Sequence, residues 1–326
     1  MDNSSEECKV DCLMKLYYLP VSYSLIFIVG LVGNVTSISI YLTKLRPWKS
    51  SSIIMINLAV TDLLYVLTLP FLVYYYSNKD SWRLGDVMCR FVRFGFHFHL
   101  YGSILFLTCA AVFRFVVVIQ PLRAAQIQKR LWGIIACSTV WIIAAVEVAP
   151  MLSIISIHNT TNKMYCLDFA NTIAVNDVRT YGWLLTAFGF ALPLVVVFIC
   201  YVGIVKQLAK GLNSSSRCRM RARRVTVLIL VVFVMCFLPY HILRVLWIET
   251  QSATGKQQNI VQAAYIISRP LAGINTFFNL ALYTLSGNKF RRALLDTFNW
   301  GRRLKKTRSV LQLAVIAKAG SDMPAA

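Results

Sequence analysis

Three arginines lie within long apolar stretches of this sequence, near one end of each stretch: Arg93, Arg244 and Arg269. A fixed positive charge at the centre of a membrane-spanning helix costs about 2.5–3.5 kcal/mol by insertion measurements. His97 follows Arg93 by four residues, so the two share one helix face. Because a guanidinium pairs bidentately with a carboxylate and stays charged, we expect these residues to bind a small ligand with several negative charges.

The three arginines are expected to point into one cavity at similar depth. Arg244 lies five residues beyond Pro239, and Arg269 lies about two and a half turns into its stretch. The alternative is that each arginine extends to the lipid headgroups, but three arginines at matched depth with His97 favour a shared cavity. Aromatic walls with hydroxyl donors are expected from four tyrosines: Tyr23, Tyr76, Tyr101 and Tyr265.

The elements that carry these residues are membrane-spanning helices. The chain has 326 residues, of which 57% are hydrophobic and 14% charged, whereas soluble domains have about 25% charged residues. A span needs about 20 apolar residues, which predicts an all-α bundle of seven helices near 17–42, 51–76, 86–120, 130–153, 179–208, 220–249 and 258–285, followed by a short amphipathic helix at 288–299. We expect one membrane domain (17–299) between an extracellular N-terminus (1–16) and a cytoplasmic tail (300–326).

The net charge of +21 is interpreted as membrane topology rather than nucleic-acid binding. Lysines and arginines concentrate after the first, third and fifth stretches and in the tail, which predicts that these segments are cytoplasmic and that the chain crosses the plasma membrane with its N-terminus outside. Sequons at Asn3 and Asn159 are then extracellular glycosylation sites. Four cysteines face the oxidising side; Cys89 and Cys166 are the favoured disulfide, and Cys8 and Cys12 can pair with each other.

Several motifs together resemble the rhodopsin-like (class A) G-protein-coupled receptors over about residues 17–299. They are Gly33-Asn34-Val35, Asn57-Leu58-Ala59-Val60-Thr61-Asp62-Leu63, Cys89 with Cys166, Trp82, Trp141, Pro193, Cys236-Phe237-Leu238-Pro239 and Asn279-Leu280-Ala281-Leu282-Tyr283. Within that family the chain is similar to a small-carboxylate branch near the purinergic receptors, first to receptors for 2-oxoglutarate and then to those for succinate. This similarity lies in Arg46-Pro47-Trp48-Lys49-Ser50-Ser51, Phe113-Arg114-Phe115, Pro239-Tyr240-His241-Ile242-Leu243-Arg244 and Ser268-Arg269-Pro270-Leu271-Ala272.

The resemblance implies a ligand site made by Arg93, His97, Arg244 and Arg269, and signalling through a heterotrimeric G protein of the Gq or Gi class. Trp247 departs from the 2-oxoglutarate receptors, which resemble this stretch but carry another arginine there. Receptors for succinate, a nucleotide or an anionic lipid such as a cysteinyl leukotriene remain alternatives. A carboxylate transporter also remains, although inverted repeats and broken helices, which are typical of transporters, are not visible. No metal cluster or nucleophile–base pair suggests an enzyme.

Two further sites are expected toward the cytoplasmic side. Asp62 is a lone acid deep in the second helix, and the resemblance implies a sodium ion held with Ser103, Asn275 and Asn279; a neutral, hydrogen-bonded acid is the alternative. His99 is expected to be a hydrogen-bonded core residue. No other cofactor is expected.

Activation and G-protein coupling are expected to involve Arg114, Phe237, Pro239 and Tyr283. The family usually has an acid before the arginine that ends the third helix, but Phe113 precedes Arg114 here. The end of the sixth helix also offers arginines rather than an acid. We therefore expect signalling without ligand. Pro239 provides a break about which the sixth helix can pivot, and basic residues after position 300 are expected to lie near anionic membrane lipid.

Overall fold

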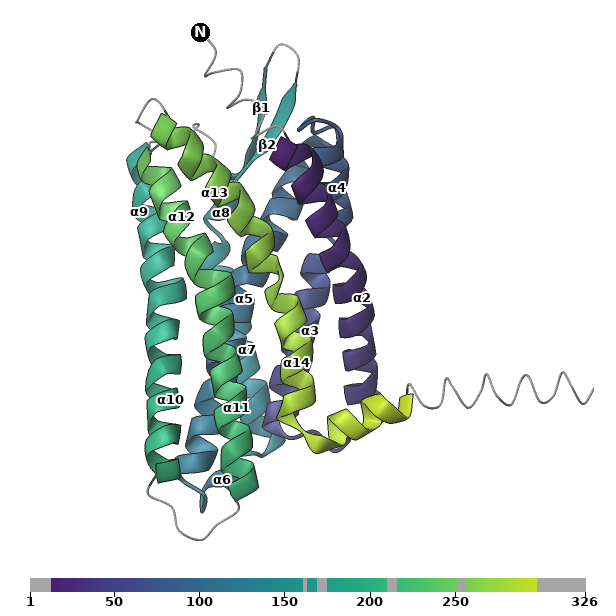
Figure 1. Ribbon diagram of the computed structural model, residues 1–326, viewed down its shortest axis with the longest axis vertical. Coiled ribbons are helices and arrows are strands. Elements are labelled where there is room, and N and C mark those ends of the chain that lie inside the picture. Colours follow the sequence, from purple (N-terminus) through teal and green to yellow (C-terminus); the bar gives the residue numbers. More distant parts are fainter. Residues whose placement is uncertain (1–12, 161–162, 169–174, 210–215, 251–255, 298–326) are drawn as a thin grey trace, which may run out of the picture.

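The apolar stretches form long helices that lie side by side, as the computed structural model shows (Figure 1). The structure describes residues 13–160, 163–168, 175–209, 216–250 and 256–297. The first four long segments are η1 (Met14–Tyr18) with α2 (Leu19–Thr43), α3 (Ser50–Val66) with α4 (Leu69–Ser77), α5 (Gly85–Ile119), and α7 (Arg130–Val148) with α8 (Met151–Ile154). The short α6 (Ala124–Ile127) connects α5 to α7.

The second half of the chain adds three more long segments. They are α9 (Val175–Thr186) with η2 (Ala187–Ala191) and α10 (Leu192–Ala209), α11 (Ser216–Val232) with η3 (Phe233–Phe237) and α12 (Leu238–Glu249), and α13 (Lys256–Gly273) with α14 (Asn275–Ser286). Pro239 lies in the first turn of α12, where its missing N–H disturbs the helix least. The chain is thus the predicted bundle of helices.

The seventh segment is divided, which differs from the single stretch expected at 258–285. α13 ends at Gly273 and α14 begins at Asn275, with Pro270 inside α13. Because proline has no N–H and its ring crowds the preceding turn, it weakens the helix around it. Among the described residues, six segments are long and apolar enough to cross a membrane by length and composition, and the seventh is not one of them. A further helix at residues 288–297 lies across the end of the bundle (Figure 1).

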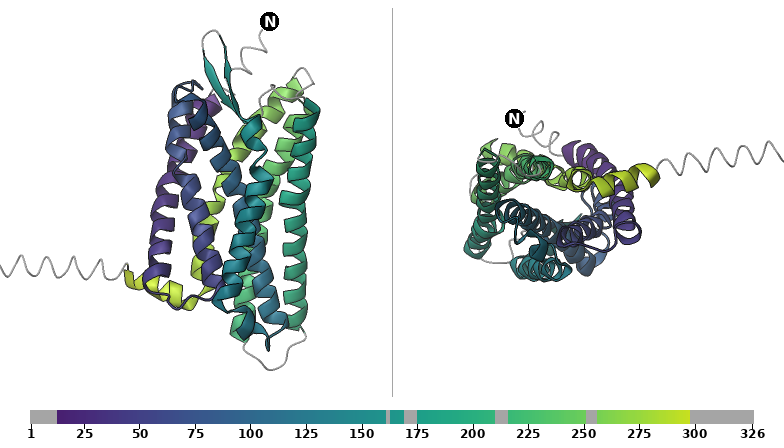
Figure 2. Two further views of the ribbon diagram at one scale, coloured as in Figure 1. Left: turned by 180° about the vertical axis from the view of Figure 1, so that it is seen from behind. Right: turned by 90° about the horizontal axis from the view of Figure 1, so that it is seen from below.

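α5 lies inside the bundle and packs against α3, α7 and α10. The view along the bundle shows the other helices around it (Figure 2). This position explains why α5 contains buried Arg93, His97, His99 and Ser103: their polar groups face protein rather than lipid. Large apolar side chains such as Val32, Ile142 and Phe198 are exposed on the outside, as expected where lipid replaces water.

The two strands mark one end of the bundle, called here the hairpin end. β1 (Ser156–Asn159) pairs antiparallel with β2 (Met164–Leu167), and Ile157 lies opposite Cys166. Cys166 forms a disulfide with Cys89, in the first turns of α5, which confirms the predicted pairing. The opposite end, called the basic end, contains the loop at residues 44–49 and the helix at 288–297.

Candidate functional site

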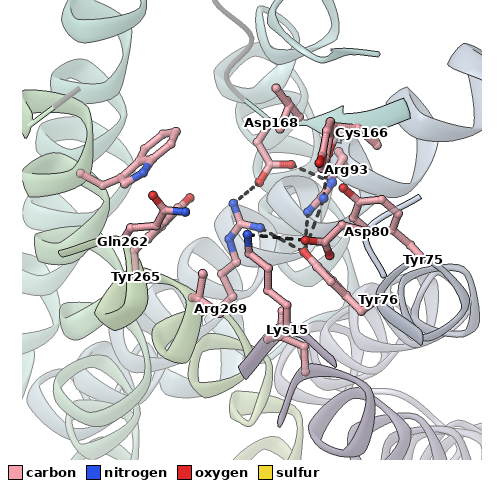
Figure 3. Close-up of a pocket in the computed structure, with 15 residues that line it drawn as sticks. Lys15, Tyr75, Tyr76, Asp80, Arg93, Cys166, Asp168, Gln262, Tyr265 and Arg269 are labelled. Atoms are coloured by element: carbon pink, nitrogen blue, oxygen red, sulfur yellow. Dashed lines mark hydrogen bonds and ion pairs between the residues drawn. The ribbon is translucent and has the colours of Figure 1, made fainter. Parts of the chain in front are cut away.

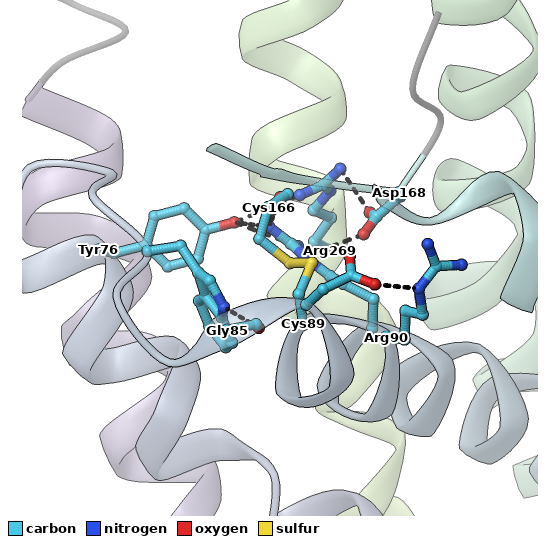
Figure 4. Close-up of a disulfide and its surroundings, with 10 residues drawn as sticks. Tyr76, Gly85, Cys89, Arg90, Cys166, Asp168 and Arg269 are labelled. Carbon is cyan, nitrogen blue, oxygen red and sulfur yellow. Dashed lines mark hydrogen bonds and ion pairs between the residues drawn. A yellow bond between two sulfur atoms is a disulfide. The ribbon is translucent and has the colours of Figure 1, made fainter. Parts of the chain in front are cut away.

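The disulfide places the β2 strand directly over Arg93. Cys89 is four residues before Arg93, one helical turn away, and Arg93 donates from Nη2 to the backbone oxygen of Cys166 at 2.9 Å. Asp168 follows Cys166 by two residues and therefore reaches the same place (Figure 4). The local backbone thus brings an acid from the loop onto a buried arginine of the third long helix.

Asp168 joins two of the predicted arginines. Its Oδ1 lies 3.0 Å from Nε of Arg93, and its Oδ2 lies 2.9 Å from Nη2 of Arg269; the Asp168 side chain is only 3% exposed. Figure 3 shows both guanidiniums turned toward this carboxylate. Burial by itself would raise the pKa of Asp168, but Arg93 and then Arg269 outweigh it and hold that pKa below its ordinary value.

Tyrosines complete the surroundings of the two guanidiniums. The hydroxyl of Tyr76 accepts from Arg269 Nη1 at 3.3 Å and lies 3.5 Å from both terminal nitrogens of Arg93. Cζ of Arg269 lies 4.7 Å from the ring centre of Tyr265, and Cζ of Arg93 lies 5.6 Å from that of Tyr75. These faces attract a cation without neutralising it, so the arginines are oriented and remain charged.

These residues line a cavity of about 210 Å³ at the hairpin end (Figure 3). Lys15 and Asp80, which form a 3.5 Å ion pair, also line it. Trp247 lines the wall and its indole stacks on Tyr265 with ring centres 5.2 Å apart. The charged lining residues are three cations, Lys15, Arg93 and Arg269, and two carboxylates, Asp80 and Asp168, which leaves an excess of positive charge.

Arg244 does not line this cavity, whereas Arg93 and Arg269 do. The Arg244 side chain is fully buried. It donates to the Tyr101 hydroxyl at 2.5 Å, to Thr186 Oγ1 at 2.9 Å and to the Gly182 carbonyl at 3.2 Å. Neutral oxygens from α5 and α9 thus accept from both terminal nitrogens of this guanidinium, because α12 packs against α9.

The other predicted ligand residues differ in position. Tyr76 and Tyr265 line the cavity. Tyr23 is buried behind Tyr76, with ring centres 6.1 Å apart, whereas Tyr101 belongs with Arg244. His97 is fully buried one turn from Arg93, within electrostatic range of Asp168. Neither Tyr23, Tyr101 nor His97 lines the cavity.

Asp168 is the main residue that the sequence analysis missed. It was not among the residues expected to bind a ligand. The signal was present, because the expected disulfide ties Cys166 to a position one turn from Arg93 and Asp168 is two residues further on. Lys15, Asp80 and Gln262 also line the cavity, but they lie outside or at the ends of the long apolar stretches, and no local pattern marks them.

A second buried polar cluster surrounds Asp62. His99 Nε2 lies 2.9 Å from its Oδ1, and Asn279 Nδ2 lies 3.1 and 2.9 Å from its two oxygens. His99 stacks on Tyr65 with ring centres 4.3 Å apart. His99 is therefore a hydrogen-bonded core residue, as expected, but its partner is the proposed sodium-binding acid itself. The remaining predicted sodium ligands, Ser103 and Asn275, are buried in the same helix bundle.

The predicted coupling residues lie toward the basic end. Arg114 Nη2 donates to the Ser286 carbonyl at the end of α14 at 3.2 Å, and Arg114 lines a cavity of about 500 Å³ there. Tyr283 is buried, with its hydroxyl 3.4 Å from Asn34 Oδ1. Phe237 is also buried, and its ring meets Phe233 edge-on with centres 5.5 Å apart.

The predicted modification sites are at the hairpin end or outside the described residues. Asn159 is exposed at the end of β1. Asn3, Cys8 and Cys12 lie outside the described residues.

Comparisons with known proteins identify the family. The model of the 7 transmembrane receptor (rhodopsin family) matches residues 33–283. The chain is 50% identical to 2-oxoglutarate receptor 1 of Rattus norvegicus over 281 residues, which covers 86% of this chain and 83% of the relative. It is 49% identical to 2-oxoglutarate receptor 1 of Mus musculus over the same shares, and 36% identical to a purinoceptor of Gallus gallus over 90% and 83%. This chain therefore belongs to the rhodopsin family of seven-transmembrane receptors.

Proposed function

We propose that this receptor binds 2-oxoglutarate, or a closely similar dicarboxylate, in the cavity between Arg93 and Arg269. The observation that carries the proposal is the convergence of these two guanidiniums, from α5 and α13, on the single carboxylate of Asp168. Guanidiniums that hold the carboxylate of Asp168 have the donors that a ligand carboxylate needs once it takes the place of Asp168. The names of the rat and mouse relatives support this ligand.

The size of the cavity favours a metabolite over a larger anion. Pockets for drug-sized ligands are usually about 300–1,000 Å³, whereas this one is about 210 Å³. Trp247 and Tyr265 stack on each other along one wall, which limits its width. A nucleotide or a cysteinyl leukotriene needs this wall to open, so these ligands remain the second candidates within the receptor class.

The proposed mechanism is an exchange of carboxylates. In the structure Asp168 bridges Arg93 and Arg269; a ligand carboxylate displaces it from one guanidinium and pairs there bidentately. The second ligand carboxylate can then pair with Lys15, which also lines the cavity. Because the ligand joins α5 to α13, it stabilises a conformation in which their outer ends are closer. Only a ligand that binds this conformation more tightly shifts the population toward it.

The effect at the basic end follows from the hinges in the chain. Pro239 in α12 and Pro270 in α13 both lie between the cavity and the basic end. Movement of the outer ends about these prolines releases the contact between Arg114 and Ser286 and exposes Arg114 to a G protein. We propose coupling to the Gq or Gi class, with the hairpin end outside the plasma membrane, because the opposite end carries the excess of lysine and arginine.

We further propose a sodium ion beside Asp62. The oxygens of Ser103, Asn275 and Asn279 are buried without a hydrogen bond among the described residues, and oxygen atoms suit a hard cation. His99 competes with such an ion, because its Nε2 lies against the same carboxylate. The ion would supply a counter-charge that holds these helices in one arrangement.

The test is a second-messenger assay in cells that express the receptor. We expect a response to 2-oxoglutarate at lower concentration than to succinate, itaconate, nucleotides or cysteinyl leukotrienes. Arg269→Ala is expected to weaken potency by about 2–3 kcal/mol, or roughly 30- to 150-fold, since it removes a buried charge contact. Arg90→Ala is the matched control, because Arg90 lies in α5 but pairs with Asp86 outside the cavity.

Two results would contradict the proposal. One is an equal loss of potency in Arg269→Ala and Arg90→Ala at matched surface expression. The other is a nucleotide or leukotriene that activates the receptor when dicarboxylates do not. Uptake of a labelled dicarboxylate without any second-messenger response would favour the transporter alternative.

A further inference from the structure

A cationic cavity lies at the basic end of the bundle, separate from the site at Asp168. Arg46, Pro47, Trp48 and Arg130 line this cavity, which has a volume of about 740 Å³. Cζ of Arg46 lies 5.1 Å from the centre of the Trp48 ring, and Cζ of Arg130 lies 5.7 Å from it. One indole therefore holds two guanidiniums that come from separate segments of the chain. We refer to these three side chains as the arginine–tryptophan clamp.

Hydrogen bonds to the backbone fix the clamp in place. Trp48 Nε1 donates to the Tyr41 carbonyl at 2.8 Å. Ser50 Oγ lies 2.7 Å from the Ile127 carbonyl oxygen and 2.6 Å from that of Lys129. These contacts hold the loop before α3 against the segment before α7, so Arg130 is positioned beside Trp48 by the fold and not by chance contact of two flexible side chains.

The charge of the clamp is not balanced within the part of the chain that the structure describes. Neither Arg46 nor Arg130 has an ion pair or a side-chain hydrogen bond there, and no acid is among the four lining residues. Both arginines are exposed. Arg130 is also the first residue of α7, whose N-cap residue Lys129 makes no side-chain cap, so the positive end of the helix dipole adds to the same potential. Such a site attracts an anion.

The surroundings indicate which anion. The residues after Arg130 are apolar and exposed: Leu131 is 63% and Trp132 51% exposed. In α2, Leu42 follows Tyr41, whose carbonyl accepts from Trp48, and is also exposed. Paired cations beside exposed apolar side chains, at the point where helices leave the membrane, match a phospholipid with its headgroup on the cations and its chains on the helix. The tail from residue 300 onward is itself basic, so Arg46 and Arg130 would repel it rather than bind it.

We propose that the arginine–tryptophan clamp binds the headgroup of a polyanionic phospholipid of the phosphoinositide type. Such a headgroup carries more than one phosphate, so each guanidinium obtains a partner and the repulsion between them is relieved. Lipid bound here would tie the loop at residues 44–49 to the start of α7. The inference rests on the proposed orientation, with the basic end in the cytoplasm, but not on the identity of the ligand at Asp168.

The test is native mass spectrometry of the full chain with added phosphatidylinositol bisphosphate, phosphatidylserine or phosphatidylcholine. The variant Arg46→Gln/Arg130→Gln is compared with Arg123→Gln, which removes an exposed arginine at the same end but outside the cavity. An arginine beside an anionic headgroup contributes about fivefold to its binding, so we expect about a 25-fold loss in the double variant, which removes two. Arg123 is outside the cavity and would not contact a headgroup bound there, so Arg123→Gln should change binding by less than about twofold.

A second variant tests the role of the ring. Trp48→Leu keeps both charges but removes the aromatic face that holds them, and we expect about a threefold loss of bisphosphate lipid. Thermal unfolding checks that both arginine variants are folded. If they are, an equal loss of lipid binding in the double variant and in Arg123→Gln would overturn the proposal. So would equal competition by a soluble inositol phosphate, which would make this a site for free phosphates. No ligand or G protein is present in this experiment, so its failure leaves the proposed function untouched.

Discussion

Oδ2 of Asp168 lies 2.9 Å from Nη2 of Arg269, and this ion pair joins the segment after the disulfide to the seventh helical segment. Both partners are largely buried: the side chains are 3% and 15% exposed. The same carboxylate pairs with Arg93. A residue of the receptor therefore occupies the position that an anionic ligand needs. The affinity for the ligand depends on how readily the ligand displaces Asp168 from the guanidiniums.

Replacing Asp168 by Asn should raise affinity for a dicarboxylate. The substitution keeps the shape of the side chain but removes the competing charge, so Arg93 and Arg269 are free to pair with the ligand. We expect affinity to rise about tenfold and the ligand-free receptor to lose about 1–3 kcal/mol of stability. Ligand binding and thermal unfolding of purified receptor measure the two effects. A fall in affinity instead would mean that Asp168 supports the ligand rather than competing with it.

The contribution of Asp168 to stability should depend on pH only in acid. Its pKa in the folded chain is lowered, with burial opposed by Arg93 and Arg269, so its ion pairs stabilise the fold at every pH above its unfolded pKa of about 3.9. That stability is lost as the pH falls through the lower, folded pKa. Thermal unfolding should therefore show a constant difference between wild type and Asp168→Asn from pH 8 to pH 5. A difference that shrinks within that window would contradict the assignment of a lowered pKa.

Signalling without ligand is expected because of the residue before Arg114. Phe113 stands there, and Arg114 donates to the Ser286 carbonyl at 3.2 Å, a neutral acceptor. Phe113→Asp provides a carboxylate next to this arginine and should reduce basal second-messenger output at least twofold. Surface expression must be matched, with Phe113→Leu as the control for loss of the ring. Basal output equal to that of untransfected cells would show that the wild-type receptor is silent.

Sodium sensitivity should increase when His99 is replaced. His99 Nε2 lies 2.9 Å from Asp62 Oδ1, so it occupies part of the space beside the carboxylate. His99→Leu removes this competitor, and we expect sodium, compared with potassium at equal ionic strength, to raise the thermal stability of the variant more than that of wild type. In Asp62→Asn the difference between the two salts should disappear. A sodium effect that survives Asp62→Asn would place the ion elsewhere.

The sequence by itself determined the bundle, the disulfide and the family. Runs of about 20 apolar residues must become helices in a membrane, because every backbone N–H and C=O there needs an internal partner. The rhodopsin-family match over residues 33–283 confirms the motif-based prediction. Charged and polar residues inside those runs, such as Arg93 and Asp62, were identifiable because they are expensive there.

Only the tertiary structure decided how those residues are paired. Helical periodicity gives the face of Arg244 but not the rotation of α12 against α9, and that rotation directs the guanidinium to Tyr101 and Thr186 instead of the cavity. Asp168 lies beyond the apolar stretches, where no periodic pattern applies, and the disulfide carries it onto Arg93. The break between α13 and α14 likewise depends on how Pro270 is accommodated by its neighbours. Contacts between residues far apart in the sequence decide between arrangements that local sequence patterns do not distinguish.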